Sequence, residues 1–361
     1  MSLFVFIFTN LILCDIIYKG KYMERFVNTH FGLRDLDKAK HWCSDVENFN
    51  INKTTFINLG GNGTINEAQA NGRCARVERM MGLKAKGNRI SSTYQDIDII
   101  AFVYGRNSES ETVGKLTSEE VSNYVDKLFL PLFIDDNKNR VSTAMACKNF
   151  SKIVFYSHCY GSQVVNEFMA DLNKKLKTYG YTKDEIEEIF SQTIHITYSP
   201  LQVDSWLPCV SINSFTDSFN FDNQMHVWFK RKYGYDLNGV ALDFEDKAFC
   251  SHVANKKNCH KVVSVFTSRL LNVNENVGNK VIDEHASDYL DLDFNWQGCK
   301  KAMGAKNAEC VSRLIGYALS WAGARSLQAE RENKLVPLNL DELYMSLQDV
   351  LKLYNENELG L

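Results

Sequence analysis

Apolar, strand-like runs alternate with helix-like segments from residue 54 onward, and this alternation limits the fold more than any other feature of the sequence. Runs rich in β-branched and aromatic residues indicate strands, and an apolar spacing of three and four indicates helices. The expected strands are 54–59, 96–105, the first half of 152–168, 193–199 and 261–268. Strands and helices in this rhythm predict an α/β fold, with a mostly parallel central sheet and helices on both faces.

The expected helices carry start and stop signals. Thr117 followed by Glu120 is the signature of a capping box, which marks a helix start. The helix that opens near Gly161 collects lysines at its end and stops near Gly180, as is typical of a helix C-terminus. Further helical patterns lie in 182–190, 308–332 and 338–354.

The chain is long enough for one large α/β domain with insertions, or for two smaller domains. It has 361 residues, of which 45% are hydrophobic and 24% charged, and this composition is that of an ordinary globular protein. The expected divisions are an N-terminal segment of uncertain status (1–50), a first part of the core (51–199), a lid-like insertion (200–260), and the rest of the core with C-terminal helices (261–361). A loop as long as 200–260 is uncommon inside a compact domain unless it has a function, so we expect it to form a lid.

Charge and cysteine usage exclude several classes of function. The net charge of −3 gives no basic stripe for nucleic acid, so no nucleic-acid partner is expected. The ten cysteines include no Cys-x-x-Cys pair, which favours reduced thiols over a disulfide framework. The densest group of metal-ligating types matches no familiar zinc spacing, so neither a metal site nor a cofactor is expected. This group is Cys250, His252, Cys259 and His260.

The N-terminal residues 3–17 are almost continuously apolar. The segment is short for a membrane span, and it lacks the basic region and small-residue cleavage site of a secretory signal. Three interpretations stay open: an export signal, a buried first element, or sequence upstream of a start at Met23. We expect a cytoplasmic protein, with export as the alternative, and any membrane contact would be made through this segment.

A cysteine stands on the turn between an expected strand and an expected helix. Residues 152–168 read KIVFYSHCYGSQVVNEF, in which four apolar residues lead into Ser-His-Cys-Tyr-Gly. A nucleophile elbow has the pattern small-x-nucleophile-x-small, because its sharp turn brings the flanking residues into contact. Cys159 takes the central place, Gly161 the last small place, and Ser157 the place where glycine is usual. A small buried cysteine without chemistry is the alternative interpretation.

With this elbow the chain resembles the α/β-hydrolase superfamily, most closely its variants with a cysteine nucleophile, such as dienelactone-hydrolase-type enzymes. The resemblance covers roughly residues 50–330 in element order, and the elbow is its specific motif. It implies a site at the carboxyl ends of the strands and the chain order nucleophile, acid, histidine. The N-terminus of the following helix would favour the reactive thiolate form of Cys159.

The resemblance also implies an oxyanion hole made of two backbone amides. One belongs to the residue after the nucleophile, here Tyr160, and the other to a loop that follows an earlier strand. The stretch 58–64, NLGGNGT, ends such a strand, although a plain glycine turn or a phosphate-binding loop is the alternative interpretation. The loop residues concerned are Gly60, Gly61, Asn62 and Gly63.

The general base and the acid follow from the same chain order. His285 lies on an expected loop past the last core strand, which is where the resemblance places the base. His195 lies within an expected strand and is interpreted as a core residue, while His158 flanks the nucleophile and would point away from it. Glu275 and Asp204 both remain candidates for the acid, with Glu275 slightly preferred.

These residues together predict a hydrolase of an ester, thioester or lactone that works through a Cys-His-acid triad and a covalent acyl-enzyme. The substrate would be a small-molecule or lipid-like acyl compound. A catalytically inactive hydrolase-like binding or effector protein is the alternative. A cysteine peptidase or an acyltransferase on the same scaffold is a third interpretation.

Overall fold

The computed structural model describes residues 28–33, 53–60, 77, 97–103, 116–200, 203–204, 206–213, 254–255, 260–266 and 305–356. Seven of its strands form one sheet in the order β1-β3-β2-β4-β5-β7-β9. All neighbouring strands of this sheet run parallel. The strands are β1 (Asn28–Leu33), β2 (Thr55–Leu59), β3 (Asp98–Val103), β4 (Ile153–Cys159), β5 (Ile194–Pro200), β7 (Cys209–Asn213) and β9 (Val262–Phe266).

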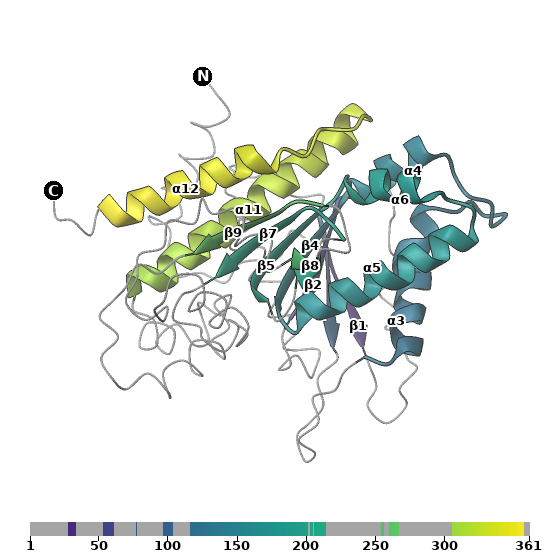
Figure 1. Cartoon of the computed structure of the whole chain (residues 1–361), viewed down its shortest axis with the longest axis horizontal. Coiled ribbons are helices and arrows are strands. Elements are labelled where there is room, and N and C mark those ends of the chain that lie inside the picture. Colours follow the sequence, from purple (N-terminus) through teal and green to yellow (C-terminus); the bar gives the residue numbers. More distant parts are fainter. Residues whose placement is uncertain are drawn as a thin grey trace, which may run out of the picture.

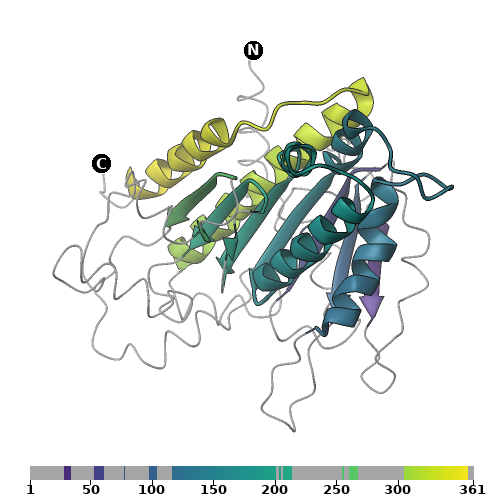
Figure 2. The same cartoon turned by 45° about the vertical axis from the view of Figure 1, so that its right-hand side comes forward.

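The described helices lie on both faces of this sheet (Figure 1 and Figure 2). One side carries α3 (Ser118–Tyr124), η4 (Val125–Phe129), η5 (Leu130–Leu132), α4 (Thr143–Phe150), α5 (Gly161–Thr178) and α6 (Lys183–Phe190). The other side carries α11 (Ala305–Glu332) and α12 (Leu340–Glu356). The α/β class predicted from the alternation is therefore confirmed. We call the two sides the α5 face and the α11 face.

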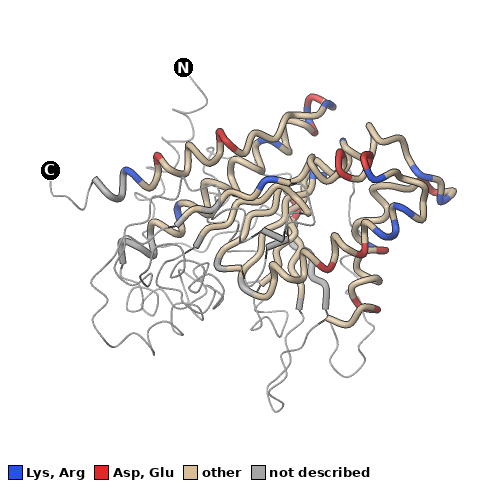
Figure 3. The backbone as a smooth tube through the Cα atoms, in the orientation of Figure 1, with Lys and Arg blue, Asp and Glu red and all other residues tan. Residues whose placement is uncertain are grey.

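Each face has its own apolar core because side chains alternate along a strand. On β4, Ile153 and Phe155 are buried on the α5 face, while Val154 and Tyr156 are buried on the α11 face. The seven strands contain one charged residue, Asp98, at the start of β3. Figure 3 shows Lys, Arg, Asp and Glu interspersed mainly along the helices. A parallel sheet covered on both faces requires such apolar strands.

Two strands of the core sheet lie in segments that the sequence analysis set apart from the core. The strand β7 (Cys209–Asn213) lies within 200–260 but pairs with β5 and β9, so this part of the expected insertion belongs to the core sheet. The strand β1 lies within the N-terminal segment and pairs with β3. Both are short runs interrupted by polar residues or glycine, so neither has the continuous apolar pattern of a buried strand.

A second, two-stranded sheet pairs β6 (Val203–Asp204) with β8 (Ala254–Asn255). Both strands come from 200–260, and most of the remainder of that segment lies outside the described residues. The expected lid is therefore untested. None of the helices that the structure describes combines the length and the apolar character needed to span a bilayer.

The helix α11 binds the amino ends of three central strands. Glu330 of α11 accepts hydrogen bonds from the backbone N–H (3.0 Å) and hydroxyl (2.8 Å) of Thr54, just before β2. Ser326 donates to the carbonyl of Ser151 before β4, at 2.9 Å. Arg325 Nη1 donates to the carbonyl of Gln192 before β5, also at 2.9 Å. The amino edge of the sheet is thereby tied to a single helix.

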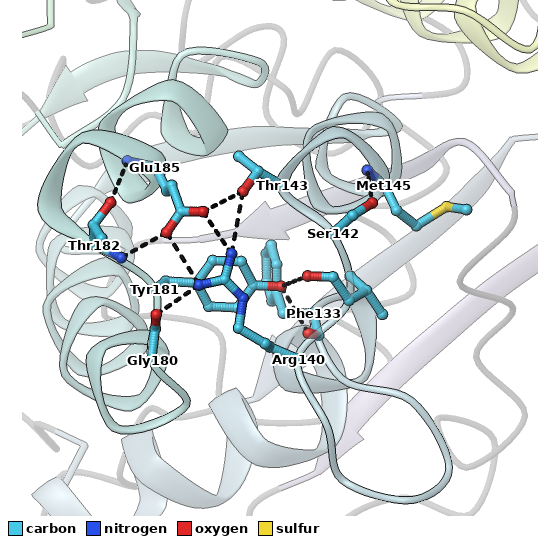
Figure 4. Close-up of polar contacts among 10 residues, drawn as sticks. Phe133, Arg140, Ser142, Thr143, Met145, Gly180, Tyr181, Thr182 and Glu185 are labelled. Atoms are coloured by element: carbon cyan, nitrogen blue, oxygen red, sulfur yellow. Dashed lines mark hydrogen bonds and ion pairs between the residues drawn. The ribbon is translucent and has the colours of Figure 1, made fainter.

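An ion pair between Arg140 and Glu185, in which both groups make further hydrogen bonds, joins the segment before α4 to the start of α6 (Figure 4). The Arg140 guanidinium lies 4.2 Å from the Tyr181 ring centroid and donates to Glu185 at 2.5 and 3.1 Å and to the Gly180 carbonyl at 2.6 Å. Thr143 donates a further hydrogen bond to Glu185 at 2.6 Å. Hydrogen bonds from Arg140 and then Thr143 hold the pKa of Glu185 well below its usual range. Because the guanidinium of Arg140 and the carboxylate of Glu185 are both paired within the protein, we assign these two residues a structural role.

Candidate functional site

The strand order reverses next to β2, and this reversal marks a place for a ligand. The chain passes from β2 to β3 on one side and then to β4 on the other side of β2. In open parallel sheets, ligands bind in the crevice outside the carboxyl ends of the strands at such a switch point. The candidate site is therefore the edge where β2 and β4 end.

The expected sharp turn is present at the end of β4. Cys159 is the last residue of β4, Tyr160 is the N-cap residue, and α5 begins at Gly161. The pairing register with β5 shifts between His158 and Cys159, so the ladder becomes irregular where the turn begins. This puts the backbone of Cys159 at the switch point, next to the N-terminus of an 18-residue helix. The side chain of Cys159 lies outside the described part of the structure.

Gly161 touches the backbone of the neighbouring strand β2. A Cβ atom added to Gly161 would lie 2.2 Å from the Leu59 carbonyl oxygen and 2.8 Å from the Gly60 carbonyl oxygen. Both distances are far shorter than any van der Waals contact, so only glycine fits. The last small position of the elbow pattern thus has a physical reason, namely the close approach of α5 to the end of β2.

Ser157 is a hydrogen-bonding residue rather than a simple substitute for glycine. Its Oγ lies 2.7 Å from His195 Nε2 and donates to Thr197 Oγ1 at 2.9 Å. With that hydroxyl hydrogen directed at Thr197, the Nε2–H of the imidazole donates to Ser157. All three side chains are at most 1% exposed. A glycine at position 157 would leave these buried groups of β5 without this partner.

Burial keeps His195 neutral. The imidazole is enclosed in the core, and desolvation lowers its pKa from 6.5 to about 3. A neutral ring at the centre of a sheet, bonded to Ser157, fits the interpretation of His195 as a core residue.

The residues expected to form the oxyanion hole are only partly described. Tyr160 is 1% exposed, and its hydroxyl accepts a hydrogen bond from the Leu116 N–H at 3.2 Å. Gly60 is buried beside Gly161, so the structure brings the start of the 60–63 loop next to the β4–α5 turn. Gly61, Asn62 and Gly63 lie outside the described residues.

The proposed base and acids are not placed relative to Cys159. His285 and Glu275 lie outside the described residues, and Asp204 belongs to the short strand β6, with its side chain outside the described part. The pairing of Cys159 with an imidazole and a carboxylate therefore stays a prediction. Among the described residues, no group of three or more His, Cys, Asp or Glu side chains is arranged to hold a metal ion.

The α11 face carries polar side chains near the same edge, and these were not among the predicted site residues. Asn58 of β2 is 1% exposed, and neither its Oδ1 nor its Nδ2 has a hydrogen-bond partner within the described structure. His158 of β4 stacks on Tyr198 of β5, with ring centroids 5.6 Å apart and planes 14° from parallel. A polar residue inside the apolar run TTFINL was the sequence signal for Asn58.

Comparison of the sequence with protein-family models and with curated proteins finds no match.

Proposed function

We propose that this chain is an acyl hydrolase of the α/β-hydrolase type, with Cys159 as its nucleophile. The observation that carries the proposal is the packing of Gly161 on the Leu59 and Gly60 carbonyls, at the point where the strand order reverses. A nucleophile elbow requires a small residue at this position, and the contact with the end of β2 leaves room only for glycine at position 161. The elbow also lies at the ligand edge of the sheet rather than at the opposite edge.

The proposed reaction begins with transfer of the Cys159 thiol proton to His285, which Glu275 or Asp204 orients. The Cys159 thiolate attacks the carbonyl carbon of an ester, thioester or lactone, and the carbonyl electrons move onto the oxygen. The backbone amides of Tyr160 and of the loop at Gly60 would stabilise this oxyanion. When the carbonyl re-forms, the alcohol or thiol leaves with a proton from His285, and a water molecule activated by His285 then releases the acid from the acyl-enzyme.

Selective alkylation tests the nucleophile. Iodoacetamide near neutral pH should label Cys159 fastest, because an active thiol reacts as thiolate. Two described thiols serve as internal controls: burial raises the pKa of Cys147 to about 11 and raises that of Cys209 further. We expect labelling of Cys159 to slow about tenfold or more in His285→Ala. Labelling of Cys159 no faster than that of Cys147 would contradict the proposal.

Turnover separates an esterase from a binding protein on the same scaffold. Nitrophenyl esters and acyl thioesters of short and long chain should be hydrolysed by the intact protein, with Cys159→Ala as the inactive control. Removal of a covalent nucleophile typically costs several orders of magnitude in kcat. A protein that binds acyl compounds but hydrolyses none of them would be the inactive binding or effector protein instead.

A further inference from the structure

The regular pairing of β4 with its two neighbouring strands ends just before Cys159. Pairing with β2 ends at Ser157, which pairs with Leu59. On the β5 side, the register shifts by one residue between His158 and Cys159, whose partner is Pro200. Proline has no N–H to donate to the ladder. The pairing of the sheet therefore supports the backbone of Cys159 less than it supports the rest of β4.

Ser157 joins β4 to β5 through its side chain, two residues before Cys159. Its hydroxyl donates at 2.9 Å to Oγ1 of Thr197, which is also its register partner on β5. The same hydroxyl oxygen accepts a hydrogen bond from His195 Nε2 at 2.7 Å. All three side chains are at most 1% exposed, so water does not compete for these bonds. The strand rise puts Ser157 about 7 Å from Cys159, so the bond to Thr197 lies next to the turn.

A second side-chain hydrogen bond joins the same two strands at their other end. Thr193, just before β5, donates to the carbonyl of Ile153 at the start of β4. Thr193 is as completely buried as Ser157. Ile153 lies six residues before Cys159, which is about 20 Å along a strand. The two bonds are alike in strand pair and burial but differ in their distance from the turn.

We propose that Ser157 is a positioning residue for Cys159, and that it acts through its hydrogen bond to Thr197 rather than through its small size. This inference rests on the proposed function and names the contact that sets the reactivity of its nucleophile. Register shifts next to active sites redirect a side chain, and such a turn needs support from contacts beside it. A displacement of about 1 Å can cost a reacting group about a hundredfold in rate. The hydrogen bond at Ser157 opposes such a displacement where the regular ladder ends.

The first experiment measures how fast iodoacetamide alkylates Cys159 in the full chain. Ser157→Ala and Ser157→Gly should each slow this reaction about tenfold near neutral pH and move its pH profile to higher pH, because less of the displaced thiol is thiolate. Thr193→Val is the matched control: it also loses a buried hydrogen bond between β4 and β5, but the rate at Cys159 should stay within about twofold. A wild-type rate in Ser157→Gly, or equal slowing in Thr193→Val, overturns the inference.

Labelling of Cys147 in the same samples separates positioning from a general loss of stability. This thiol is buried in the core of the α5 face, so it reacts faster only when the protein opens. We expect its rate to stay unchanged while that of Cys159 falls.

A second pair of variants keeps the test decisive if the Ser157 variants do not fold. Thr197→Val keeps the shape of threonine and loses the acceptor of the Ser157 bond, whereas Thr197→Ser keeps the acceptor. Alkylation of Cys159 should slow about tenfold in Thr197→Val and stay near the wild-type rate in Thr197→Ser. Equal rates in these two variants overturn the inference.

Steady-state kinetics with a short-chain nitrophenyl ester distinguish failure of this inference from failure of the proposed function. Thr197→Val should lower kcat about tenfold and leave KM within about twofold, because the nucleophile is displaced and the substrate contacts are kept. If the wild type hydrolyses the ester and Thr197→Val does so equally well, the hydrolase stands and the positioning role is wrong. If Cys159 is alkylated fast through Ser157 but no ester or acyl thioester is hydrolysed, the positioning role stands and the hydrolase is wrong.

Discussion

Two sets of buried polar side chains, one on each face of the sheet, differ in their hydrogen bonding. On the α5 face, Ser157, His195 and Thr197 form a closed set of hydrogen bonds between β4 and β5. On the α11 face, Asn58 is equally buried and has no partner within the described residues. A satisfied set stabilises the fold, whereas an unsatisfied buried group lowers its stability. The contrast separates buried polar residues that stabilise the sheet from a buried amide that the described residues leave without a hydrogen bond.

The largest change in stability is expected when His195 is protonated at low pH. Its pKa is about 3 when folded and about 6.5 when unfolded. Between these values the unfolded chain binds more protons, so stability falls as the pH decreases from 6.5 toward 3. We expect His195 to contribute about 4 kcal/mol to the loss of unfolding free energy between pH 7 and pH 3. Urea unfolding at several pH values would measure it.

His195→Gln is the control for this pH dependence, since glutamine can donate to Ser157 but does not titrate. Between pH 7 and pH 3, the unfolding free energy of this variant should fall by about 4 kcal/mol less than that of the wild type. If wild type and variant lose stability in parallel, His195 is not buried as the structure places it.

Gly161→Ala should have the next largest effect, because its Cβ would overlap the Leu59 carbonyl. We expect a loss of about 3 kcal/mol in unfolding free energy, as for overpacking against backbone that cannot move away. Gly180→Ala is the comparison: that glycine has a φ of +85° and open space around it, so only backbone strain of about 1 kcal/mol applies. Equal losses for the two variants would mean that α5 does not approach β2 closely.

Ser157→Ala should cost about 2 kcal/mol, because it leaves both the His195 ring and the Thr197 hydroxyl without a bond. A double-mutant cycle with His195→Phe would isolate the contact, and we expect a coupling energy of about 1 kcal/mol. If the two losses of unfolding free energy are additive, Ser157 and His195 do not interact, and the hydrogen bond between them is contradicted.

The smallest effect belongs to the α11 face, where Ser326 donates to the Ser151 carbonyl at the amino edge of the sheet. Ser326→Ala should lower the unfolding free energy by about 1 kcal/mol, as one buried neutral hydrogen bond is lost. The exposed Gln328 on the same helix is the control, and Gln328→Ala should change stability by less than about 0.5 kcal/mol. A loss for Gln328→Ala equal to that for Ser326→Ala would contradict this difference.

Much of the fold could be predicted from local patterns. The expected strands 54–59, 96–105, 193–199 and 261–268 correspond to β2, β3, β5 and β9, and the capping box at Thr117 is present. The strand β7 escaped prediction because CVSIN is short and half polar, and its burial depends on β5 and β9 on either side. Periodicity detects an element's own faces and not the neighbours that cover them.

The site was predicted only as far as its turn. The elbow pattern placed Cys159 at the end of β4 and required a small residue at 161, and both features are present. The role of Ser157 depends on His195, 38 residues away on the next strand, so no local motif reveals it. The open amide of Asn58 is likewise a property of packing, because the same residue type at position 149 finds a partner.

Because α11 binds the amino ends of the strands, the strands are synthesised first and the core can be completed only after α11 has followed. Glu330 and Thr54 are separated by 276 positions, and Ser326 and Ser151 by 175. During translation, β2, β4 and β5 emerge from the ribosome well before α11, which hydrogen-bonds to their amino ends. Until residues 305–332 emerge, the apolar layer around Val154 and Ile196 stays uncovered and open to aggregation. The scaffold that carries Cys159 is therefore completed only by a helix that is translated well after its strands.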